Sequence, residues 1–393
     1  MTLSHRISNV TGGGSDGWDV FYRARAMVAA GLPVTELTIG EHDIRTAPVI
    51  LQEMMRAAEA GHTGYAAVPG TPDLRDAVAR RIERMTGVPT GRDNVVITPG
   101  GQSALFAAHL AAGDPGDRAL YIDPYYATYP GTLRALGLVP CPVPAHPENG
   151  FQPERSDLAP VATGAASLLI NTPNNPTGAV YSRATLEMIA QIVTEEDLWL
   201  ISDEVYDSQV WDGTHLSPRA LPGMADRTLV VGSMSKSHAM TGSRVGWICG
   251  PEAAIAALAN LSTHTTYGVP GYIQDAATFA LGQGSEMEQE VAAPFGRRRD
   301  RALELLGRQN VVKAAPPQGA MYMMLDIRAT GLSGEGFANA LLDDHLIAVM
   351  PGESFGRAAA GHIRVAMTVE DTRFAAALET LLSFAAERAR AAA

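Results

Sequence analysis

A single lysine, Lys236, stands in a run of small and apolar residues, VVGSMSKSHAMTGSRVGW (230–247), directly after a short apolar strand. A lysine that is removed from water has a lowered pKa, and its amine becomes a nucleophile. Arg244 follows eight residues later and offers a guanidinium that can bind a phosphate through two hydrogen bonds. Taken alone, a lysine is more often a solvated side chain, so the other motifs must decide between the two interpretations.

Three further motifs follow strand-like segments. TPGGQSAL (98–105) places two glycines between a strand and a helix, where free backbone N–H groups favour a phosphate, although a tight turn explains them equally well. NTPNNPTG (171–178) offers two adjacent asparagines, or only turn-forming residues. SDEVY (202–206) contains Asp203 and Tyr206, which could instead cap a helix and pack in the core. Each motif alone leaves both interpretations open.

Apolar strand-like segments alternate with helix-like segments along most of the chain, and the motifs stand at the strand ends. Examples are NVVITPG (94–100), SLLINTPNNPTG (167–178), LWLISDEVYD (198–207) and RTLVVGSMSK (227–236). Uniformly apolar strands separated by helices indicate an α/β fold with a parallel sheet that is covered on both faces. Ligands bind such sheets outside the carboxyl ends of the strands, where the motifs gather.

Length and composition restrict the classes of protein. The chain of 393 residues is 46% hydrophobic and 18% charged, so it can bury a large core and hold two domains. We expect a large domain at 47–284 and a smaller α+β domain formed by 1–46 together with 285–393. The net charge of −12 argues against a surface for nucleic acid or for an anionic membrane.

The expected compartment is the cytoplasm. Two cysteines, Cys141 and Cys249, form neither a disulfide framework nor a metal-ligand spacing, and His238 and His264 lack ligand partners, so no metal site is expected. The N-terminal stretch has no apolar core of the kind found in secretory signals. No apolar run reaches about 18 residues, so no membrane span is expected.

Together the motifs match the requirements of one cofactor, pyridoxal 5′-phosphate. A lysine amine forms an imine with the cofactor aldehyde, and a lowered pKa lets the same amine carry protons. A carboxylate beside the pyridine nitrogen keeps that nitrogen protonated, so that the ring can accept carbanion electrons. An asparagine and a tyrosine can hydrogen-bond the ring oxygen, while the glycine-rich turn and the arginine hold the phosphate.

Five motifs in order and spacing carry a resemblance to a known family. They are GYAAVPGTPDLRDAVARRI (64–82), PNNPTGAVY (173–181), SDEVY (202–206), SMSKSHAMTGSRVGW (233–247) and HIRVAM (362–367). Over nearly its whole length the chain resembles the class I/II aminotransferases of the fold-type-I pyridoxal-phosphate superfamily. The resemblance implies a large domain with a mostly parallel seven-stranded sheet, a homodimer with shared active sites, and transfer of an amino group from an L-α-amino acid to a 2-oxo acid.

The resemblance also implies a role for each matching residue. Lys236 would form the imine and move the proton, Asp203 would pair with the pyridine nitrogen, and Asn175 and Tyr206 would contact the ring hydroxyl. Arg364 would bind the substrate α-carboxylate, aided by Asn175 and by the backbone of Gly40. The remaining expected contacts are the ring stacking of Tyr126, the phosphate ligands Gly101, Gln102, Ser233, Ser235 and Arg244, and Tyr65, which would reach the phosphate of the neighbouring subunit.

The substrate is less clearly indicated. The stretches GWDVFYRA (17–24), YGVPGYIQDAA (267–277) and LDIRATGLS (325–333) look most like the arginine–pyruvate transaminase branch, with Ser243 as a departure from it. Gln102 stands where aspartate aminotransferases of this subgroup usually carry a lysine. A basic substrate side chain could be received by Glu41 or Asp43, or both could simply cap turns. Three further residues could line the pocket, namely Trp18, His42 and Tyr267, although packing is the favoured role for Trp18 and Tyr267.

Three alternatives stay open beside an arginine-type donor. One is aspartate as the donor, and another is β-elimination by a C–S lyase, because the fold and cofactor permit other reactions. The third is a regulatory protein that only senses the cofactor, which the sequence disfavours because it offers no room for a DNA-binding segment before Trp18.

Overall fold

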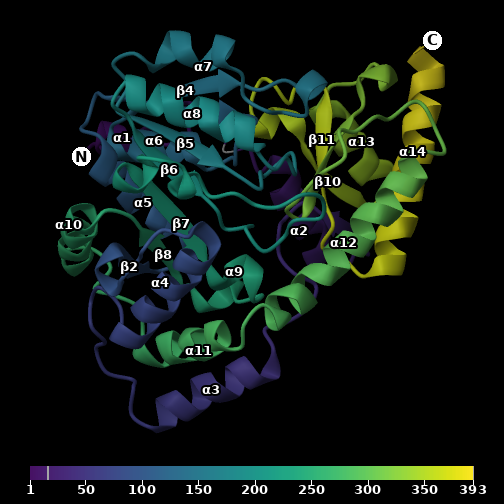
Figure 1. The fold of residues 1–393 in the computed structure, drawn as a ribbon. Coiled ribbons are helices and arrows are strands. Elements are labelled where there is room, and N and C mark those ends of the chain that lie inside the picture. The colour runs from purple at the N-terminus through teal and green to yellow at the C-terminus, as the bar shows by residue number, and fades with distance from the viewer. Residues whose placement is uncertain (16, 393) are drawn as a thin grey trace.

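The computed structural model describes residues 1–15 and 17–392, and the chain folds around two β-sheets (Figure 1). In the larger sheet one strand, β8, runs antiparallel to both neighbours, and all other adjacent pairs are parallel. This confirms the expected α/β class and the mostly parallel seven-stranded sheet. The strands lie in the order β2 (Val95–Thr98), β8 (Gly246–Cys249), β7 (Thr228–Ser233), β6 (Trp199–Asp203), β5 (Ser167–Asn171), β3 (Arg118–Asp123) and β4 (Val139–Pro144).

Helices cover both faces of this sheet because alternate strand residues point to opposite sides and nearly all are apolar. Leu169 and Ile201 pack in one cluster with α5 (Gly101–Ala112), α6 (Tyr129–Leu136) and α10 (Glu252–Thr263). Leu168 and Leu200 face the other side. The helices on that side are α7 (Arg155–Ala162), α8 (Arg183–Glu195), α3 (Pro48–Glu59), α4 (Pro72–Thr86) and α11 (Gly271–Gly282).

The smaller sheet joins the two ends of the chain. Its strand order is β1 (Thr35–Leu37), β10 (Ile347–Pro351), β11 (His362–Ala366) and β9 (Tyr322–Asp326), with β1 parallel to β10 and the other pairs antiparallel. Around it pack α2 (Asp19–Ala29), α12 (Glu286–Leu306), α13 (Gly334–His345) and α14 (Asp371–Ala392), on the right in Figure 1. The domain boundaries at residues 47 and 285 stay a prediction, although β1 and β10 do join segments from both predicted parts of the small domain.

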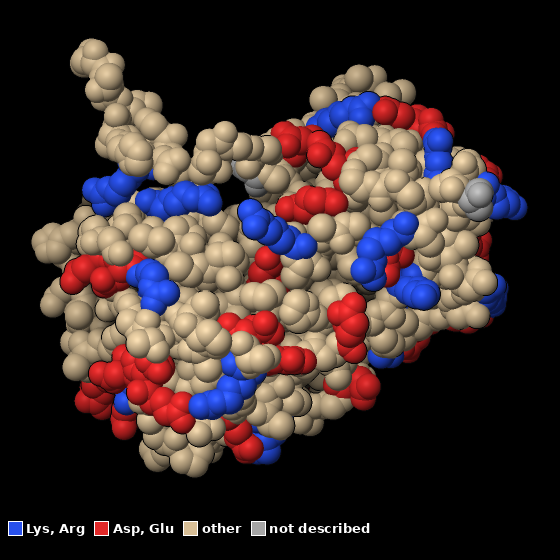
Figure 2. All heavy atoms as spheres, turned by 90° about the horizontal axis from the view of Figure 1, so that it is seen from above, with Lys and Arg blue, Asp and Glu red and all other residues tan. Residues whose placement is uncertain are grey.

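The surface carries charges of both signs. On the face drawn in Figure 2, basic and acidic side chains are interspersed over the molecule. Within residues 1–15 and 17–392, no helix combines the length and the apolar character needed to cross a bilayer.

Candidate active site

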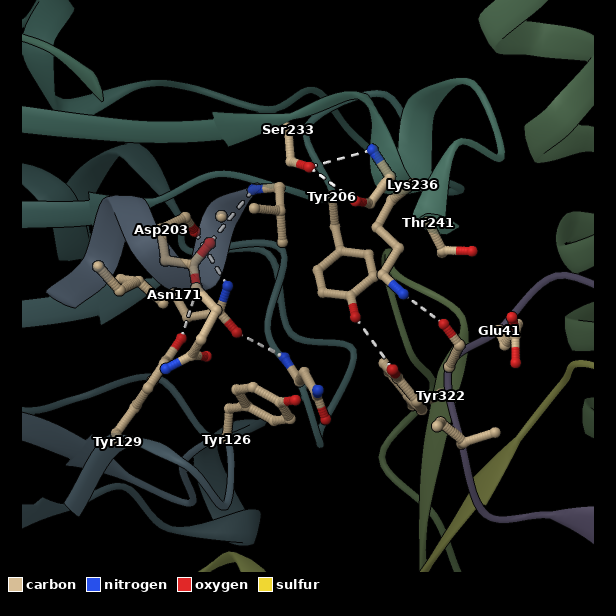
Figure 3. Close-up of a pocket in the computed structure, with 18 of the residues that line it drawn as sticks. Glu41, Tyr126, Tyr129, Asn171, Asp203, Tyr206, Ser233, Lys236, Thr241 and Tyr322 are labelled. Carbon is tan, nitrogen blue, oxygen red and sulfur yellow. Dashed lines mark hydrogen bonds between the residues drawn. The ribbon is translucent and has the colours of Figure 1, made fainter. Parts of the chain in front are cut away.

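A cavity of about 310 Å³ lies beyond the carboxyl ends of β5, β6 and β7, and segments of the smaller sheet form its other wall (Figure 3). The adjacent parallel strands end at the same edge of the sheet, so the motifs that follow them meet there. All but one of the residues expected at the site line this cavity. They are Gly40, Gly101, Gln102, Tyr126, Asn175, Asp203, Tyr206, Ser233, Ser235, Lys236, Arg244 and Arg364.

Lys236 projects into the cavity from α9 (Met234–Ser237), a single helical turn that begins directly after β7. Its Nζ donates a hydrogen bond to the carbonyl oxygen of Gly40, in the opposite wall. Burial lowers the pKa of the amine from 10.5 to about 8; Glu41 opposes this shift, whereas the cations of Arg364 and Arg244 add to it. At pH 7 about a tenth of the amine is therefore unprotonated, far more than for an ordinary lysine, and this form can act as a nucleophile or base.

Asp203 ends β6 and lies across the cavity from Lys236 in the view of Figure 3. The hydroxyl of Tyr129 donates a hydrogen bond of 2.6 Å to its Oδ2, and the Asn171 side chain donates to its backbone carbonyl at 2.9 Å. Burial raises the pKa of Asp203 to about 6, against the effect of the Tyr129 hydrogen bond, which lowers it. A carboxylate in this setting gains from a cationic partner such as a protonated ring nitrogen.

The turn between β2 and α5 forms an anion cradle. Gly100 has a φ of +83°, a backbone conformation that favours glycine, and the missing β-carbon leaves room for the guanidinium of Arg244. Behind it, α5 presents the free N–H groups of its first turn. The Ser233 hydroxyl donates to Ser235 Oγ at 2.9 Å, which places a second hydroxyl at the same cavity wall.

The side chain of Gln102 is held at the start of α5 by two threonines. Its Nε2 donates to Thr132 Oγ1 at 2.9 Å, and its Oε1 accepts from Thr128 Oγ1 at 3.1 Å. Both ends of the amide are engaged, so this side chain is oriented by its neighbours.

Arg364 is a buried cation in the wall formed by β11. Its guanidinium lies between the rings of Tyr322 and Phe355, 4.4 and 4.3 Å from their centroids. It donates to Asn175 Oδ1 at 2.8 Å and to the carbonyl of Thr38. Within the described residues it has no carboxylate partner. A buried cation without a counter-ion is costly, and an anionic ligand relieves that cost.

Tyr206 and Tyr322 close the cavity beside Lys236. Their hydroxyls lie 3.0 Å apart, and the Tyr206 ring centroid is 6.0 Å from the Lys236 Nζ. A β-carbon at Gly40 would overlap the Tyr322 hydroxyl, so this position requires glycine. The Gly40 backbone can therefore approach both the amine and any ligand held there.

Tyr65 is the one expected site residue outside the cavity. Its side chain is 92% exposed and makes an edge contact with the ring of Tyr267, whose centroid is 5.1 Å away. Trp18 lines the cavity, and its ring meets Tyr126 edge-on at 6.5 Å. The arrangement agrees with a pocket-lining place for Trp18 but not for Tyr267.

Glu41 and Asp43, the two acidic residues that could receive a basic substrate side chain, have different surroundings in the segment after β1. Glu41 lines the cavity, and its carboxylate makes no hydrogen bond or ion pair with any residue that the structure describes. Asp43 instead forms a two-point ion pair with Arg298, at 2.9 and 2.6 Å. His42 contacts the main chain of Lys236 rather than the cavity.

The cavity fits pyridoxal phosphate on the chemistry of its donors. The cradle at Gly100, Arg244 and the start of α5 suits a phosphate, Asp203 suits a protonated pyridine nitrogen, and the Lys236 amine suits an aldehyde carbon. The Asn175 amide keeps its Nδ2 available for a ring oxygen, because its Oδ1 accepts from Arg364.

Comparison with known proteins agrees with this chemistry. The family model described as aminotransferase class I and II matches residues 33–381, so the chain belongs to this family, whose members use pyridoxal phosphate. It is therefore an aminotransferase. Its relatives include the arginine–pyruvate transaminase AruH of Pseudomonas aeruginosa, with 41% identity over 94% of each chain. The aspartate/prephenate aminotransferase of Thermus thermophilus is 36% identical over 89% of this chain and 90% of that one.

A solved structure shares the fold closely. The Thermus thermophilus aspartate aminotransferase with maleate superposes with a TM-score of 0.91 at 34% identity, and the match covers 98% of this chain and 99% of the other. This similarity supports the two-sheet architecture.

The sequence interpretation missed two tyrosines that the structure places at the site. Tyr129 lies three residues after Tyr126 in DPYYATYP, on the first turn of α6. Tyr322 begins β9, in the methionine-rich segment GAMYMMLDIR (319–328). Tyr129 could have been suspected because it follows Tyr125 and Tyr126 closely in the same motif. Nothing in the sequence around Tyr322 indicates that its ring packs against Arg364.

Proposed function

We propose that this aminotransferase moves the amino group of a basic L-α-amino acid, arginine first among them, to pyruvate or a similar 2-oxo acid. The observation that carries the proposal is Glu41, an exposed carboxylate in the cavity wall that makes no hydrogen bond or ion pair with a described residue and acts on Lys236 only through its charge. The 41% identity to a relative named as an arginine–pyruvate transaminase supports the same choice.

The charges of the cavity suit a monocarboxylate with a cationic side chain. The described lining contains three cations, Lys236, Arg244 and Arg364, and each has a proposed partner: the cofactor aldehyde, the phosphate and the α-carboxylate. No lining cation remains for a second carboxylate. The only lining carboxylates are Asp203, which is hydrogen-bonded to Tyr129, and Glu41. Glu41 can therefore pair with a guanidinium or an ammonium of the substrate.

The chain's own residues have distinct tasks in the reaction. Pyridoxal phosphate supplies the electron sink and carries the amino group between the two half-reactions. Asp203 holds the proton on the ring nitrogen, and Tyr129 holds Asp203. Arg364 orients the substrate through its carboxylate, which places the α-hydrogen within reach of Lys236 Nζ. Lys236 then takes the α-proton and delivers it, and its lowered pKa suits a base that works near neutral pH.

A homodimer with shared active sites belongs to the same proposal. Tyr65 is 92% exposed in the single chain. It is therefore free to reach the phosphate of a neighbouring subunit, as its motif implies. Leu51 and Met55 of α3 are also exposed, at 48% and 65%. Apolar side chains gathered on one exposed helix favour contact with another protein surface. Sedimentation at assay concentration tests the dimer, and a fully active monomer would contradict it.

The test of the donor is a spectral titration of the cofactor-loaded protein with single amino acids and no 2-oxo acid. We expect arginine or lysine to convert the cofactor to its amino form at lower concentrations than alanine, aspartate or glutamate. Preference for aspartate would make the protein an aspartate aminotransferase, as several relatives are named. Release of pyruvate and ammonia from a cysteine conjugate would indicate a C–S lyase instead.

A further inference from the structure

The loop between β1 and α3 contacts Lys236 at both ends of that residue. Gly40 accepts a hydrogen bond from the side-chain Nζ through its carbonyl oxygen. Two residues later, the His42 Nε2 lies 3.1 Å from the main-chain carbonyl oxygen of Lys236. A carbonyl oxygen can only accept, so Nε2 carries the hydrogen and donates. Amine and main chain of the lysine are thus both tied to one short loop.

The imidazole of His42 is neutral at ordinary pH. Burial lowers the pKa of His42 to about 4, and the charge of Lys236 lowers it further, against Asp43 and the hydrogen bond to the Lys236 carbonyl, which both raise it. The ring packs edge-on against Phe295 at 5.3 Å. The groups that face Lys236 are Glu41, Arg364, Arg244 and the Tyr206 ring. A neutral His42 can therefore donate to the carbonyl without adding a second cation beside the amine.

The loop is itself anchored directly after His42. Asp43 binds the buried guanidinium of Arg298 at 2.9 and 2.6 Å, and Arg298 also donates to the carbonyl of Met367. The Thr46 hydroxyl donates to the carbonyl of Ala239 at 2.7 Å. Because these contacts hold the loop in place, the hydrogen bond from His42 can hold the main chain of Lys236 in a defined position.

We propose that His42 is a positioning residue for Lys236, which fixes the lysine main chain relative to the Gly40 carbonyl and so the place from which Nζ takes and returns its proton. The inference needs only aminotransferase chemistry and is independent of the choice of donor. Gln209 also donates to the Lys236 carbonyl, at 3.2 Å, so the turn at α9 keeps one hydrogen bond when His42 is replaced.

Two substitutions separate the hydrogen bond from the ring packing. His42→Phe keeps a ring against Phe295 but removes the donor, while His42→Gln removes the ring and retains an amide N–H. We expect His42→Phe to slow the half-reaction at saturating amino acid about tenfold or more, because small misplacement of a catalytic group is costly. The half-saturating concentration should change less than about twofold, and His42→Gln should recover to within about threefold of the wild-type rate.

A second measurement needs no turnover. The chain contains only two lysines, Lys236 and the exposed Lys313. Acetylation of the cofactor-free full chain by acetic anhydride over a pH series, read by mass spectrometry, reports Lys236 with Lys313 as an internal reference. In His42→Phe the Lys236 midpoint should move upward from about 8, because a lysine that is no longer held in the cavity reaches water.

Either of two results would overturn the proposal. One is a His42→Phe protein with the wild-type half-reaction rate and labelling midpoint. The other is a His42→Gln protein as slow as His42→Phe, because an N–H donor at position 42 would then fail to restore the rate. A His42→Phe protein that fails to fold leaves the decision to His42→Gln, whose recovered rate and midpoint would support the hydrogen bond.

Discussion

The hydroxyl of Tyr129 donates a 2.6 Å hydrogen bond to the Asp203 carboxylate, although 74 residues separate the two in the chain. The contact forms because Asp203 ends the central strand β6, while Tyr129 begins α6, a helix that covers one face of the sheet. It stabilises the charged form of a carboxyl whose burial favours the neutral form. The hydrogen bond from Tyr129 therefore increases the fraction of Asp203 that is ionised and able to pair with a protonated ring nitrogen.

Tyr129→Phe tests that relationship. The hydrogen bond lowers the pKa of Asp203, so its loss should raise that pKa further above about 6. Hydrogen bonds to charged groups are worth about 1.5 to 3 kcal/mol, so we expect the half-reaction to slow about tenfold or more. The slow variant should also lose activity at a higher pH on the acid side. Tyr125→Phe, beside the site but outside the cavity, is the matched control, and an equal loss in both would contradict the role of Tyr129.

Replacing Asp203 by asparagine should stabilise the folded chain at neutral pH, whereas replacing Asp207 by asparagine should destabilise it. The pKa of Asp203 is raised from 3.8 to about 6, so the folded, cofactor-free chain is penalised for the charge, increasingly between about pH 4 and pH 6. Asp203→Asn should therefore stabilise that form above about pH 6, by up to about 3 kcal/mol, and the gain should vanish towards pH 4. Thermal unfolding with and without cofactor measures this gain, and a variant less stable than wild type at pH 8 would count against it.

Asp207 provides the control for that measurement. It is also buried, but the Arg81 guanidinium, 2.6 and 3.0 Å away, holds its pKa below the usual value despite burial. Its ionised form stabilises the fold above the ordinary pKa near 3.8, and this contribution is lost as the pH falls. Asp207→Asn should cost about 3 to 5 kcal/mol at neutral pH, because Arg81 then loses a buried partner.

The sequence predicted which residues at the strand ends belong to the site, but it did not predict which residues pair across the molecule. Lys236, Asp203 and Asn175 could be selected because each stands at the end of an apolar strand, and parallel strands bring those ends together. The pairing of Asp43 with Arg298 spans 255 residues, and nothing in either local sequence indicates it. Local sequence patterns predict strands and turns. Which residues form an ion pair across the molecule depends on how the helices and loops pack together, and this packing cannot be predicted from local patterns.

Lys236→Ala should separate cofactor binding from proton transfer. The phosphate cradle at Gly100 and Arg244 is untouched, so we expect the variant to bind some cofactor without a covalent bond. The half-reaction should fall at least about a hundredfold, as removal of a general base usually costs. Borohydride reduction followed by mass spectrometry should find the cofactor on Lys236 in the wild type and on no lysine in the variant. Lys313→Arg should behave as wild type, and cofactor fixed to Lys313 would refute the assignment.

Arg364→Lys should weaken the binding of substrates through their carboxylate. The guanidinium lies between two rings and donates to two oxygens, a geometry that a lysine ammonium cannot reproduce. Loss of one partner of a buried, charged hydrogen bond costs about 2 kcal/mol or more, so the half-saturating amino-acid concentration should rise about thirtyfold or more. Agmatine, which is arginine without the α-carboxylate, should bind both proteins alike. A similar weakening for agmatine would indicate general damage to the cavity.

Glu41→Gln should change which donor is preferred. Glu41 lines the cavity without a hydrogen bond or ion pair to a described residue, and it is exposed, so a pair with a substrate guanidinium is worth about 1 kcal/mol. The kcat/KM for arginine should fall about fivefold, and added salt should reduce the difference between the two proteins. Alanine, which has no cationic side chain, serves as the control, because an effect through the pKa of Lys236 would change both donors alike, whereas loss of a side-chain pair lowers only the value for arginine. Equal loss for alanine would place Glu41 in the shared chemistry, while an unchanged arginine rate would remove it from substrate selection and leave the basic-donor proposal without its main support.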